Sequence, residues 1–400
     1  MKTKLKLASL AVAAACSISA QAQVSGDVVK IGFITDVSGL YSDIDGKGGA
    51  EAIKMAIADF GGNVLGKKIE LVTADHQNKA DIASSKAREW FDRDGMDVLI
   101  GGTNSGAALA MSKVAAEKKK PIFVIGAGSA RLTNEECSHY TVHYAYDTVA
   151  LAKGTGSAVV KQGGKSWYFL TADYAFGISL ENDTAAIVKA HGGSVNGSVK
   201  HPLSAPDFSS FLLQAQSSKA QILGLANAGG DTINAIKAAN EFGITKSMKM
   251  AGLLVFINDI HSLGLNLTQG MYLTDSWYWN QSAETRAWAR RYFDKMKKMP
   301  SSLQAADYSA TMSYLHAVKA AGTDNPDKVM EQLKKLKIND MYAKNAYVRG
   351  DGRMVHDMYL MQVKSAAESK EPWDYYKVAQ VIPGDQAWTT KAESKCALWK

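Results

Sequence analysis

From residue 28 onward the chain alternates short apolar runs with polar loops and amphipathic segments. Residues 29–35 form an apolar run of strand length, 36–48 are polar, and apolar side chains return at helical spacing over 53–60. The same pattern recurs at 98–114 and again from 121–131. Because strands and helices alternate, this part of the chain is predicted to form a parallel sheet covered by helices.

A second set of the same units follows a predicted helix over 146–161. The apolar runs at 166–171 and 221–225 are each followed by a glycine-containing loop and a helical pattern. We expect further strands at 253–256 and 271–274. The chain is thus predicted to be an α/β protein with two consecutive doubly wound parallel-sheet units.

Beyond residue 279 the pattern is first helical and then β-like. Helical spacing covers 288–296 and 303–321, and a turn at 351–352 separates short strand-like runs. Helices followed by a hairpin do not make a third α/β unit, so we expect them to complete the first two, with the chain crossing back. The predicted strands of this part are 347–348, 358–363 and 376–381.

The first 22 residues have the three parts of a secretory signal. A basic stretch at 2–6 precedes an apolar run at 7–15 that is too short to span a bilayer, and residues 20–22, Ala-Gln-Ala, form a small-x-small cleavage site. We therefore expect an exported chain that begins at Gln23. An alternative is a lipidated Cys16, although an alanine stands three residues before it, where a bacterial lipobox usually has leucine.

Composition and charge narrow the class of protein. Hydrophobic residues make up 46% of the chain and charged residues 21%, which suits a folded core and excludes disorder. The net charge of +7 becomes +4 without the three signal lysines, too weak an excess for a nucleic-acid partner.

No later window is apolar enough to span a membrane, so the exported chain is expected in the periplasm. Cys137 and Cys396 remain there and are expected to form a disulfide.

Each enzymatic motif is incomplete. The run 46–48, Gly-Lys-Gly, lacks the hydroxyl residue and spacing of a P-loop, and no third glycine completes a dinucleotide fingerprint. His139 and His143 have the spacing of zinc ligands on a helix, but the segment between them favours extended structure. The run 126–130, Gly-Ala-Gly-Ser-Ala, lacks the second glycine of a nucleophile elbow. We therefore expect no enzyme, no metal and no cofactor.

Loops at the carboxyl ends of the parallel strands are the expected ligand site, as in other open α/β sheets. In the first half they carry hydroxyl and amide side chains beside predicted helix N-termini, where free backbone N–H groups favour a carboxylate. The same side chains could equally cap their helices. These candidates are Ser38, Tyr41, Thr103, Asn104, Ser105 and Ser129.

The second half contributes aromatic side chains and one carboxylate, a set that suits an apolar ligand body and a cationic group. Asp231 could instead be an ordinary N-cap. Of the run 277–279, only one of the two tryptophans is expected at the ligand, because alternate side chains of an extended segment face opposite sides. These candidates are Tyr174, Phe176, Asn227, Asp231 and Trp277.

The order of several short stretches resembles that of a known family. Behind the signal come Val-Lys-Ile-Gly-Phe at 29–33, Ser-Gly-Leu-Tyr at 38–41, Gly-Gly-Ala-Glu-Ala at 48–52 and Lys-Ile-Glu-Leu-Val at 68–72. Together with later stretches up to residue 231 they are similar to the leucine/isoleucine/valine-binding protein family, the type I periplasmic solute receptors of ATP-driven (ABC) importers. The resemblance implies two lobes, joined by three crossovers, that close on a ligand.

The resemblance also implies roles for individual residues. Ser105 and Ser129 match the hydroxyl residues that hold a ligand carboxylate, with backbone from the turn at Ala127 and Gly128. Asp231 matches the acidic residue that pairs with a ligand ammonium.

Three features depart from the family pattern. They are Phe176 in place of a common tyrosine, the aromatic run at 277–279 and the C-terminal extension. These departures resemble the branch of the family that takes up aromatic acids.

The implied lobes divide the chain at its crossovers. Residues 1–22 are the signal peptide, and a C-terminal tail at 383–400 returns to the first lobe. The first lobe is expected to combine 24–144 with 278–340, and the second 145–277 with 341–382.

We therefore expect a monomeric receptor that captures a small carboxylate and delivers it to an inner-membrane ABC permease. The acidic residue at 231 favours a branched-chain or hydrophobic amino acid, and an aromatic acid is the alternative ligand. A ligand sensor for a membrane kinase or chemoreceptor would need the same hinge. An exported hydrolase is disfavoured because no nucleophile–base pair can be named.

Overall fold

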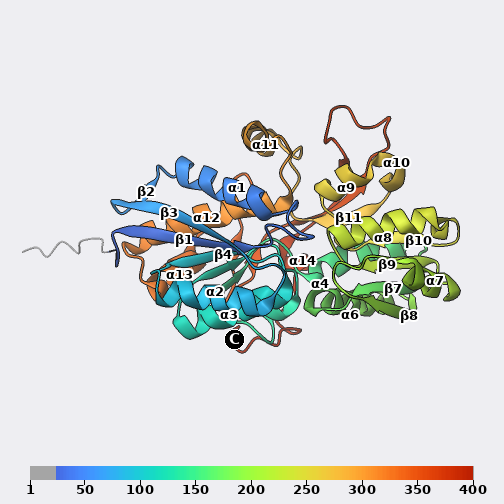
Figure 1. Cartoon of the computed structure of the whole chain (residues 1–400), viewed down its shortest axis with the longest axis horizontal. Helices are drawn as coiled ribbons and strands as arrows, with labels where there is room; N and C mark the ends of the chain where they lie inside the picture. Colours follow the sequence, from blue (N-terminus) through green and yellow to red (C-terminus); the bar gives the residue numbers. More distant parts are fainter. Residues whose placement is uncertain (1–23, 400) are drawn as a thin grey trace, which may run out of the picture.

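The structure, a computed structural model, describes residues 24–399. The expected signal peptide at 1–22, its cleavage before Gln23 and the alternative lipidation of Cys16 lie outside these residues. Figure 1 shows two α/β halves side by side along the long axis, each built around its own sheet. The predicted architecture of two parallel-sheet units is confirmed.

The first half contains a six-stranded sheet in the order β2-β3-β1-β4-β5-β6. Neighbouring strands are parallel, except that β2 runs antiparallel to β3. β1 lies inside the sheet because both of its faces are apolar. The strands are β1 (Val28–Thr35), β2 (Asn63–Val64), β3 (Lys67–Asp75), β4 (Val98–Gly101), β5 (Ile122–Val124) and β6 (Thr141–His143).

Helices cover both faces of this sheet. α1 and α12 pack together on one face, where they share a core with Phe33, and α2 and α3 pack together on the other, with Ile34 (Figure 1). Because α12 begins after residue 300, a distant part of the chain completes the first half. The helices are α1 (Gly46–Asp59), α2 (Ala80–Asp92), α3 (Ser105–Lys118), α12 (Ser302–Ala321) and α13 (Pro326–Lys335).

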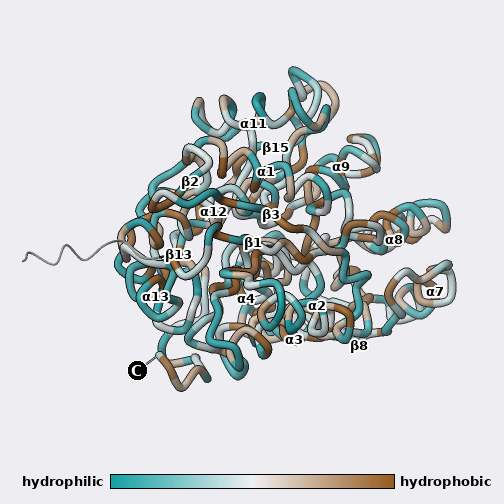
Figure 2. The backbone as a smooth tube through the Cα atoms, turned by 60° about the vertical axis from the view of Figure 1, so that its left-hand side comes forward, coloured by the Kyte–Doolittle hydropathy of each residue, from teal (hydrophilic) through white to brown (hydrophobic). Residues whose placement is uncertain are grey.

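The second half contains a four-stranded parallel sheet in the order β10-β9-β7-β8. α7 and α8 pack on the face that carries Leu170 and Leu225, while α6 packs with Trp167 and Phe169. Figure 2 shows hydrophobic residues gathered inside both halves and hydrophilic residues on the outer helices and loops. The elements are β7 (Ser166–Ala172), α6 (Ala175–Ala190), β8 (Ser194–His201), α7 (Ser209–Ser217), β9 (Ile222–Ala226), α8 (Gly230–Glu241) and β10 (Lys249–Gly252).

The strand predicted at 253–256 is wrong. β10 ends at Gly252, and the apolar run that follows leads directly into α9 (Ile257–Leu263). Leu253, Leu254 and Val255 are nevertheless buried. The hydrophobic run therefore indicated burial, which a loop inside the core satisfies as well as a strand does.

The chain passes back and forth between the halves. After β6 the chain continues through α4 (Thr148–Leu151), a π-helical turn and α5 (Ser157–Lys161) into the second half, and after β11 it returns to form α11 (Ala283–Met296), α12 and α13. It then passes back to β14, which pairs with β11 and β15 in an antiparallel sheet. The exact lobe boundaries stay a prediction. The strands of this part are β11 (Tyr272–Asp275), β12 (Tyr347–Val348), β13 (Met354–Val355), β14 (Met358–Val363) and β15 (Tyr376–Ile382).

The predicted disulfide between Cys137 and Cys396 is present, with the two Cα atoms 5.8 Å apart. It ties the tail that follows β15 to the loop after η1 (Ala130–Thr133) in the first half. Lys395 adds an exposed ion pair of 3.0 Å with Glu135 at the same place. The tail is therefore bonded to the first half.

Candidate functional site

A small cavity lies where loops of the two halves meet. The first half supplies the loop before α1 and the segments after β4, β5 and β6, and the second supplies the start of α6 and the loops after β9 and β10. The walls leave room for about one water molecule, so a ligand of amino-acid size requires the halves to move apart. The lining residues are Tyr41, Ile44, Thr103, Gly126, Tyr146, Tyr174, Phe176, Ala228 and Leu254.

The loop before α1 is folded around the buried carboxylate of Asp36. Its oxygens accept hydrogen bonds from the backbone N–H groups of Gly39 (2.6 Å) and Tyr41 (2.9 Å) and from Nδ2 of Asn78 (2.6 Å). This loop places the Tyr41 hydroxyl 2.6 Å from that of Tyr174 in the other half. Burial raises the pKa of both tyrosines, so the two phenols stay neutral and link the halves by one hydrogen bond.

Serine hydroxyls connect the loops that follow β4 and β5. Ser105 Oγ accepts a hydrogen bond of 3.1 Å from the backbone N–H of Ser129, and Ser129 Oγ lies 2.8 Å from Ser179 Oγ in the second half. Asn104 is the N-cap of α3, because its side-chain oxygen accepts a hydrogen bond of 3.0 Å from the N–H of Ala107. Of the two roles considered for these side chains, Asn104 has the capping role, whereas the serines join loop to loop and half to half.

The turn at Ala127 and Gly128 lies behind the cavity. Its two carbonyl groups accept hydrogen bonds from the segment 143–148, which leads into the second half. A Cβ atom added at Gly128 would lie 2.6 Å from the ring of Tyr146 and 2.8 Å from that of Phe176. Glycine at this position therefore allows the aromatic rings of the second half and of the crossover to approach the first half closely.

Sequence reasoning found four of the lining residues, Tyr41, Thr103, Tyr174 and Phe176, and missed the others. Tyr146, whose hydroxyl donates a hydrogen bond of 2.5 Å to the carbonyl of Gly126, follows the end of β6 and could have been found by the same rule. The aliphatic residues gave no signal, because their pattern is that of the core. The missed residues are Ile44, Gly126, Tyr146, Ala228 and Leu254.

Asp231 is buried just outside this lining. Its carboxylate accepts a hydrogen bond of 3.1 Å from the backbone N–H of Ser204 in its own half. The alternative prediction of an N-cap is wrong, because Gly229 is the N-cap of α8 and Asp231 lies in the first turn. Burial raises the pKa of Asp231, and its charge contributes to the raised pKa of Tyr41 and Tyr174. Asp231 is thus near the tyrosines but already bonded within the second half.

Ser38 and Asn227 also lie away from the cavity. Ser38 is exposed and donates a hydrogen bond of 2.6 Å to Asp75. Asn227 is buried, with Nδ2 3.0 Å from Nε2 of His201 in the same half. Both side chains therefore support loops whose other residues reach the cavity.

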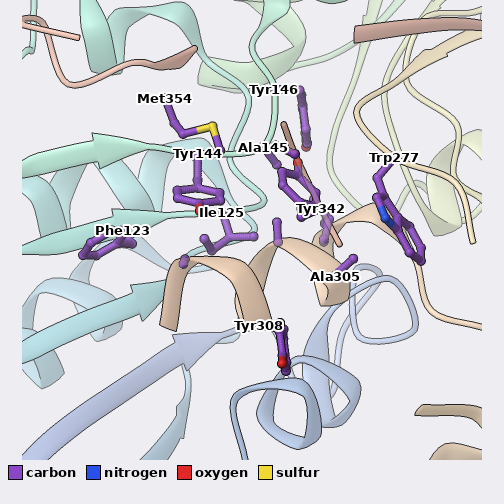
Figure 3. Packing of buried hydrophobic residues seen from close by; sticks show 14 of the residues in the cluster. Phe123, Ile125, Tyr144, Ala145, Tyr146, Trp277, Ala305, Tyr308, Tyr342 and Met354 are labelled. Carbon is purple, nitrogen blue, oxygen red and sulfur yellow. The ribbon is translucent and has the colours of Figure 1, made fainter. Parts of the chain in front are cut away.

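Trp277 is a core residue in this structure. The whole run 277–279 is buried, and β11 ends at Asp275, so the alternation assumed for an extended segment does not apply. Trp277 Nε1 donates a hydrogen bond of 3.0 Å to the carbonyl of Met341, and its ring packs edge-on against Trp288 at 5.8 Å. Figure 3 shows Trp277 in the same buried cluster as Tyr144 and Tyr146. The structure does not bring Trp277 to the cavity.

Among the described residues that line the cavity, none carries a charge. Phenol rings, one further aromatic ring and aliphatic side chains make up most of the wall, and Thr103 adds a hydroxyl. The serine hydroxyls of Ser105 and Ser129 lie in the adjoining loops. The arrangement can therefore enclose an apolar body and hydrogen-bond a polar end.

The sequence profile of the periplasmic binding protein family matches residues 28–369. The chain belongs to this family. A periplasmic binding protein from Burkholderia mallei is 74% identical, and its crystal structure superimposes with a TM-score of 0.93 over 94% of this chain and 100% of that one. A branched chain amino acid ABC transporter periplasmic ligand-binding protein from Burkholderia xenovorans LB400 is 40% identical, with a TM-score of 0.82 over 93% of this chain and 100% of that one.

More distant periplasmic binding proteins share the fold. An ABC transporter solute binding protein from R. palustris, in complex with benzoate, is 20% identical with a TM-score of 0.82, and the match covers 93% of this chain and 100% of that one. Leu/Ile/Val-binding protein homolog 4 of Brucella abortus is 22% identical over 255 residues, 61% of each chain. The match thus spans less than two thirds of this curated relative. These names describe binding proteins, which agrees with the predicted non-enzymatic class, and the predicted family is confirmed.

Two features are absent from the described part of this periplasmic binding protein. Over residues 24–399 no helix is long and apolar enough to cross a membrane. The same residues contain no group of three His, Cys, Asp or Glu side chains arranged to hold a metal ion. The extended conformation predicted for 139–143 is confirmed for 141–143, which form β6, whereas 139 and 140 form a turn.

Proposed function

We propose that this protein is an extracytoplasmic receptor that captures a small organic carboxylate between its halves and delivers it to the permease of an ABC importer. The observation that carries the proposal is a cavity walled by both halves, with Tyr41 and Tyr174 in contact across it. A site of this kind is completed only when the halves come together, so occupancy is coupled to the shape that a membrane partner would recognise.

An aromatic or bulky apolar carboxylate fits the uncharged wall best. Phe176, Tyr146 and Leu254 offer the ring faces and aliphatic surface that an apolar body needs, and the hydroxyls near Ser105 and Ser129 offer donors to a carboxylate. An ammonium group in the cavity would lack a counter-charge in the wall, which is costly in a water-poor site.

A hydrophobic amino acid is the second candidate. The 40% identical relative is a branched chain amino acid ABC transporter periplasmic ligand-binding protein. The charge of Asp231 acts on the cavity residues Tyr41 and Tyr174. For this candidate the side chain of Asp231 would have to leave the Ser204 N–H and turn towards the ligand.

Ligand capture should compact the protein and should depend on the glycine at 128. In a thermal-shift screen of aromatic acids and amino acids, a true ligand at 100 times its Kd should stabilise the fold by about 2.7 kcal/mol. Because the halves must separate to admit a ligand, small-angle scattering should then show a smaller radius of gyration with that ligand than for the ligand-free protein in solution. Gly128→Ala should weaken binding about tenfold, because its methyl group meets the rings of Tyr146 and Phe176 when the halves close.

The matched control is Gly106→Ala on α3, whose added Cβ atom comes within 4 Å of only the side-chain oxygen of Asn104, at 3.2 Å. This variant should bind as the parent protein does. A radius of gyration that ligand leaves unchanged would count against capture between the halves, and equal affinities of the two glycine variants would count against the close approach at Gly128.

Asp231→Asn should distinguish the two ligand classes. For an aromatic or other plain carboxylate we expect less than about a threefold change in Kd, because the carboxylate of Asp231 is engaged by backbone N–H of its own half. For an amino acid whose ammonium pairs with Asp231, removing one member of a buried charge pair costs about 3–5 kcal/mol, a loss of two to three orders of magnitude.

Titration calorimetry with the best ligand of the screen measures this change. Asp173→Asn, in an exposed ion pair of the same half, is the control and should leave Kd unaltered. A hundredfold loss in Asp231→Asn alone would refute our preference for a ligand without an ammonium group.

A further inference from the structure

Two carboxyl groups face each other inside the first half. Asp45 ends the loop before α1 and Asp307 lies on α12, and the two side chains are within hydrogen-bonding distance. Both residues are 0% exposed. Asp45 Oδ2 accepts a hydrogen bond of 2.5 Å from the hydroxyl of Thr35, whereas Asp45 Oδ1 and both oxygens of Asp307 have no conventional donor.

The backbone is shaped to leave room for this pair. A Cβ atom added at Gly49, in the first turn of α1, would overlap an oxygen of Asp45 and one of Asp307. These three unpaired oxygens lie in a confined space. A hydrogen bond between the two carboxyl groups is therefore the interaction that can satisfy them. Two carboxyl groups in such contact can form a hydrogen bond only if one of them carries a proton.

Among the described residues, no lysine or arginine is among the groups whose charge acts on the pair. The titratable groups that act on the pair or feel its charge are Asp36 in the loop, Tyr146 in the crossover and Tyr292 on α11. The nearby lysines, Lys295 on α11 and Lys298 just after it, are paired at the surface with Glu51 and Asp43.

The two members of the pair have different roles. Burial raises the pKa of both carboxyl groups, and the charge of Asp45 raises that of Asp307 further. Asp45 sits at the N-terminus of α1, where the helix dipole favours a negative charge. Asp307 is therefore the member that carries the proton, and the carboxylate of Asp45 accepts the hydrogen bond from it.

A short chain of hydroxyls connects the pair to the cavity. The Thr35 hydroxyl that donates to Asp45 lies 3.2 Å from the hydroxyl of Thr103, which lines the cavity. The Thr103 hydroxyl also accepts a hydrogen bond of 3.2 Å from the N–H of Asp36, the residue that folds the loop carrying Tyr41. These hydrogen bonds connect Asp45 to two residues of the cavity wall, Thr103 and Tyr41.

We propose that Asp45 and Asp307 share a single proton and that Asp307, acting through Asp45 and Thr35, is a positioning residue for the ligand cavity. The positioning role rests on the proposed function, while the shared proton does not. Loss of the proton places a second negative charge behind Thr103, opens the contact between α1 and α12, and disfavours a carboxylate ligand.

The sign of the pH effect follows from the raised pKa. The folded protein binds a proton that the unfolded chain releases above about pH 4, so the contribution of the pair is present at low pH and is lost as pH rises. In Asp307→Asn an amide N–H replaces the shared proton and removes this dependence. In Asp307→Ala no donor remains to Asp45.

Thermal unfolding of the ligand-free protein between pH 5 and pH 9 tests the shared proton. The Tm of the parent protein should fall relative to that of Asp307→Asn by roughly 2 °C per pH unit. The control Asp59→Asn, at the other end of α1, should run parallel to the parent protein over this range, because Arg291 and Tyr308 hold the pKa of Asp59 below its usual value and this carboxylate is charged in both the folded and the unfolded state above pH 5. Parallel curves for the parent protein and Asp307→Asn would overturn the proposal, as would a parent Tm that depends on the concentration of Na⁺ or Ca²⁺ at constant ionic strength, because a cation would then replace the proton.

Calorimetry with benzoate or the best carboxylate of the screen tests the positioning role. The Kd of the parent protein should rise roughly fivefold from pH 6 to pH 9, that of Asp307→Asn should stay constant, and Asp307→Ala should bind more weakly at every pH. Equal pH profiles for the parent protein and Asp307→Asn would refute the positioning role and leave the proposed function standing. Failure of every carboxylate to bind would refute the proposed function instead. The thermal measurement would still test whether Asp45 and Asp307 share a proton.

Discussion

Replacing Cys137 and Cys396 together by serine should lower the free energy of unfolding by up to about 5 kcal/mol. The bond closes a loop between residues separated by 259 positions, so about two thirds of the described chain lies inside it. In the chain-entropy account such a loop restricts the unfolded state strongly, and the folded state keeps its other tail contacts. The tail should also lose its connection to the first half more readily than any other segment of the fold.

Urea unfolding of the double serine variant in parallel with the oxidised parent protein measures this difference. Lys395→Met is the control, because it removes only the exposed ion pair with Glu135 and should cost less than about 1 kcal/mol. Mass spectrometry after alkylation of the unfolded parent protein should find no free thiol on either cysteine. Two alkylated thiols, or equal stability of the parent protein and the double variant, would contradict the assigned role of the bond.

Arg353→Met should destabilise the fold by about 3–5 kcal/mol. Arg353 is 0% exposed, and its guanidinium donates hydrogen bonds to the carbonyls of Tyr144, Tyr146 and Met354. Its Nη1 lies 3.7 Å from the buried carboxylate of Asp147. Methionine fills a similar volume but would leave three carbonyls and one carboxylate without their partner in the interior.

The same arginine joins three separate segments at the junction of the halves. It bonds to the first crossover at residues 144–147, belongs itself to the hairpin of β12 and β13, and stacks on Trp388 of the tail at 4.1 Å. Arg353→Lys should recover only part of the loss, because an ammonium group cannot reproduce the planar set of donors.

Chemical unfolding at pH 7 measures both substitutions. The control is Arg291→Met, which breaks an exposed pair with Asp59 and should cost less than about 1 kcal/mol. If Arg353→Met proved as stable as the control, the guanidinium would not be needed to hold the crossovers together.

The elements that could be predicted from the sequence are those whose signal is local. The strand at 28–35 and the helix over 302–321 follow from the spacing of their apolar residues. This spacing within the segment determines which side chains face the core. Tyr41, Thr103, Tyr174 and Phe176 could be placed at the ligand cavity for a related reason. Each follows the end of a parallel strand, and these ends meet at one edge of a sheet.

Other features of the site could not be predicted, because they depend on how one layer lies on another. Leu254 has the appearance of a strand residue and Trp277 that of a surface aromatic, yet the first lines the cavity and the second is core. The family resemblance implies a ligand contact for Asp231. In the structure its carboxylate instead accepts a hydrogen bond from the backbone N–H of Ser204. Whether each of these side chains lines the cavity or is buried in the core depends on residues elsewhere in the chain.

The sequence by itself determined the family, the two parallel-sheet units and the pairing of Cys137 with Cys396, because repeated local patterns and the count of exported cysteines carry that information. The tertiary structure alone determined the uncharged wall of the cavity, the buried contact of Asp45 with Asp307 and the junction around Arg353. These arise where segments far apart in sequence are pressed together in a close-packed interior, and their energies depend on distances and exclusion of water that no local pattern specifies.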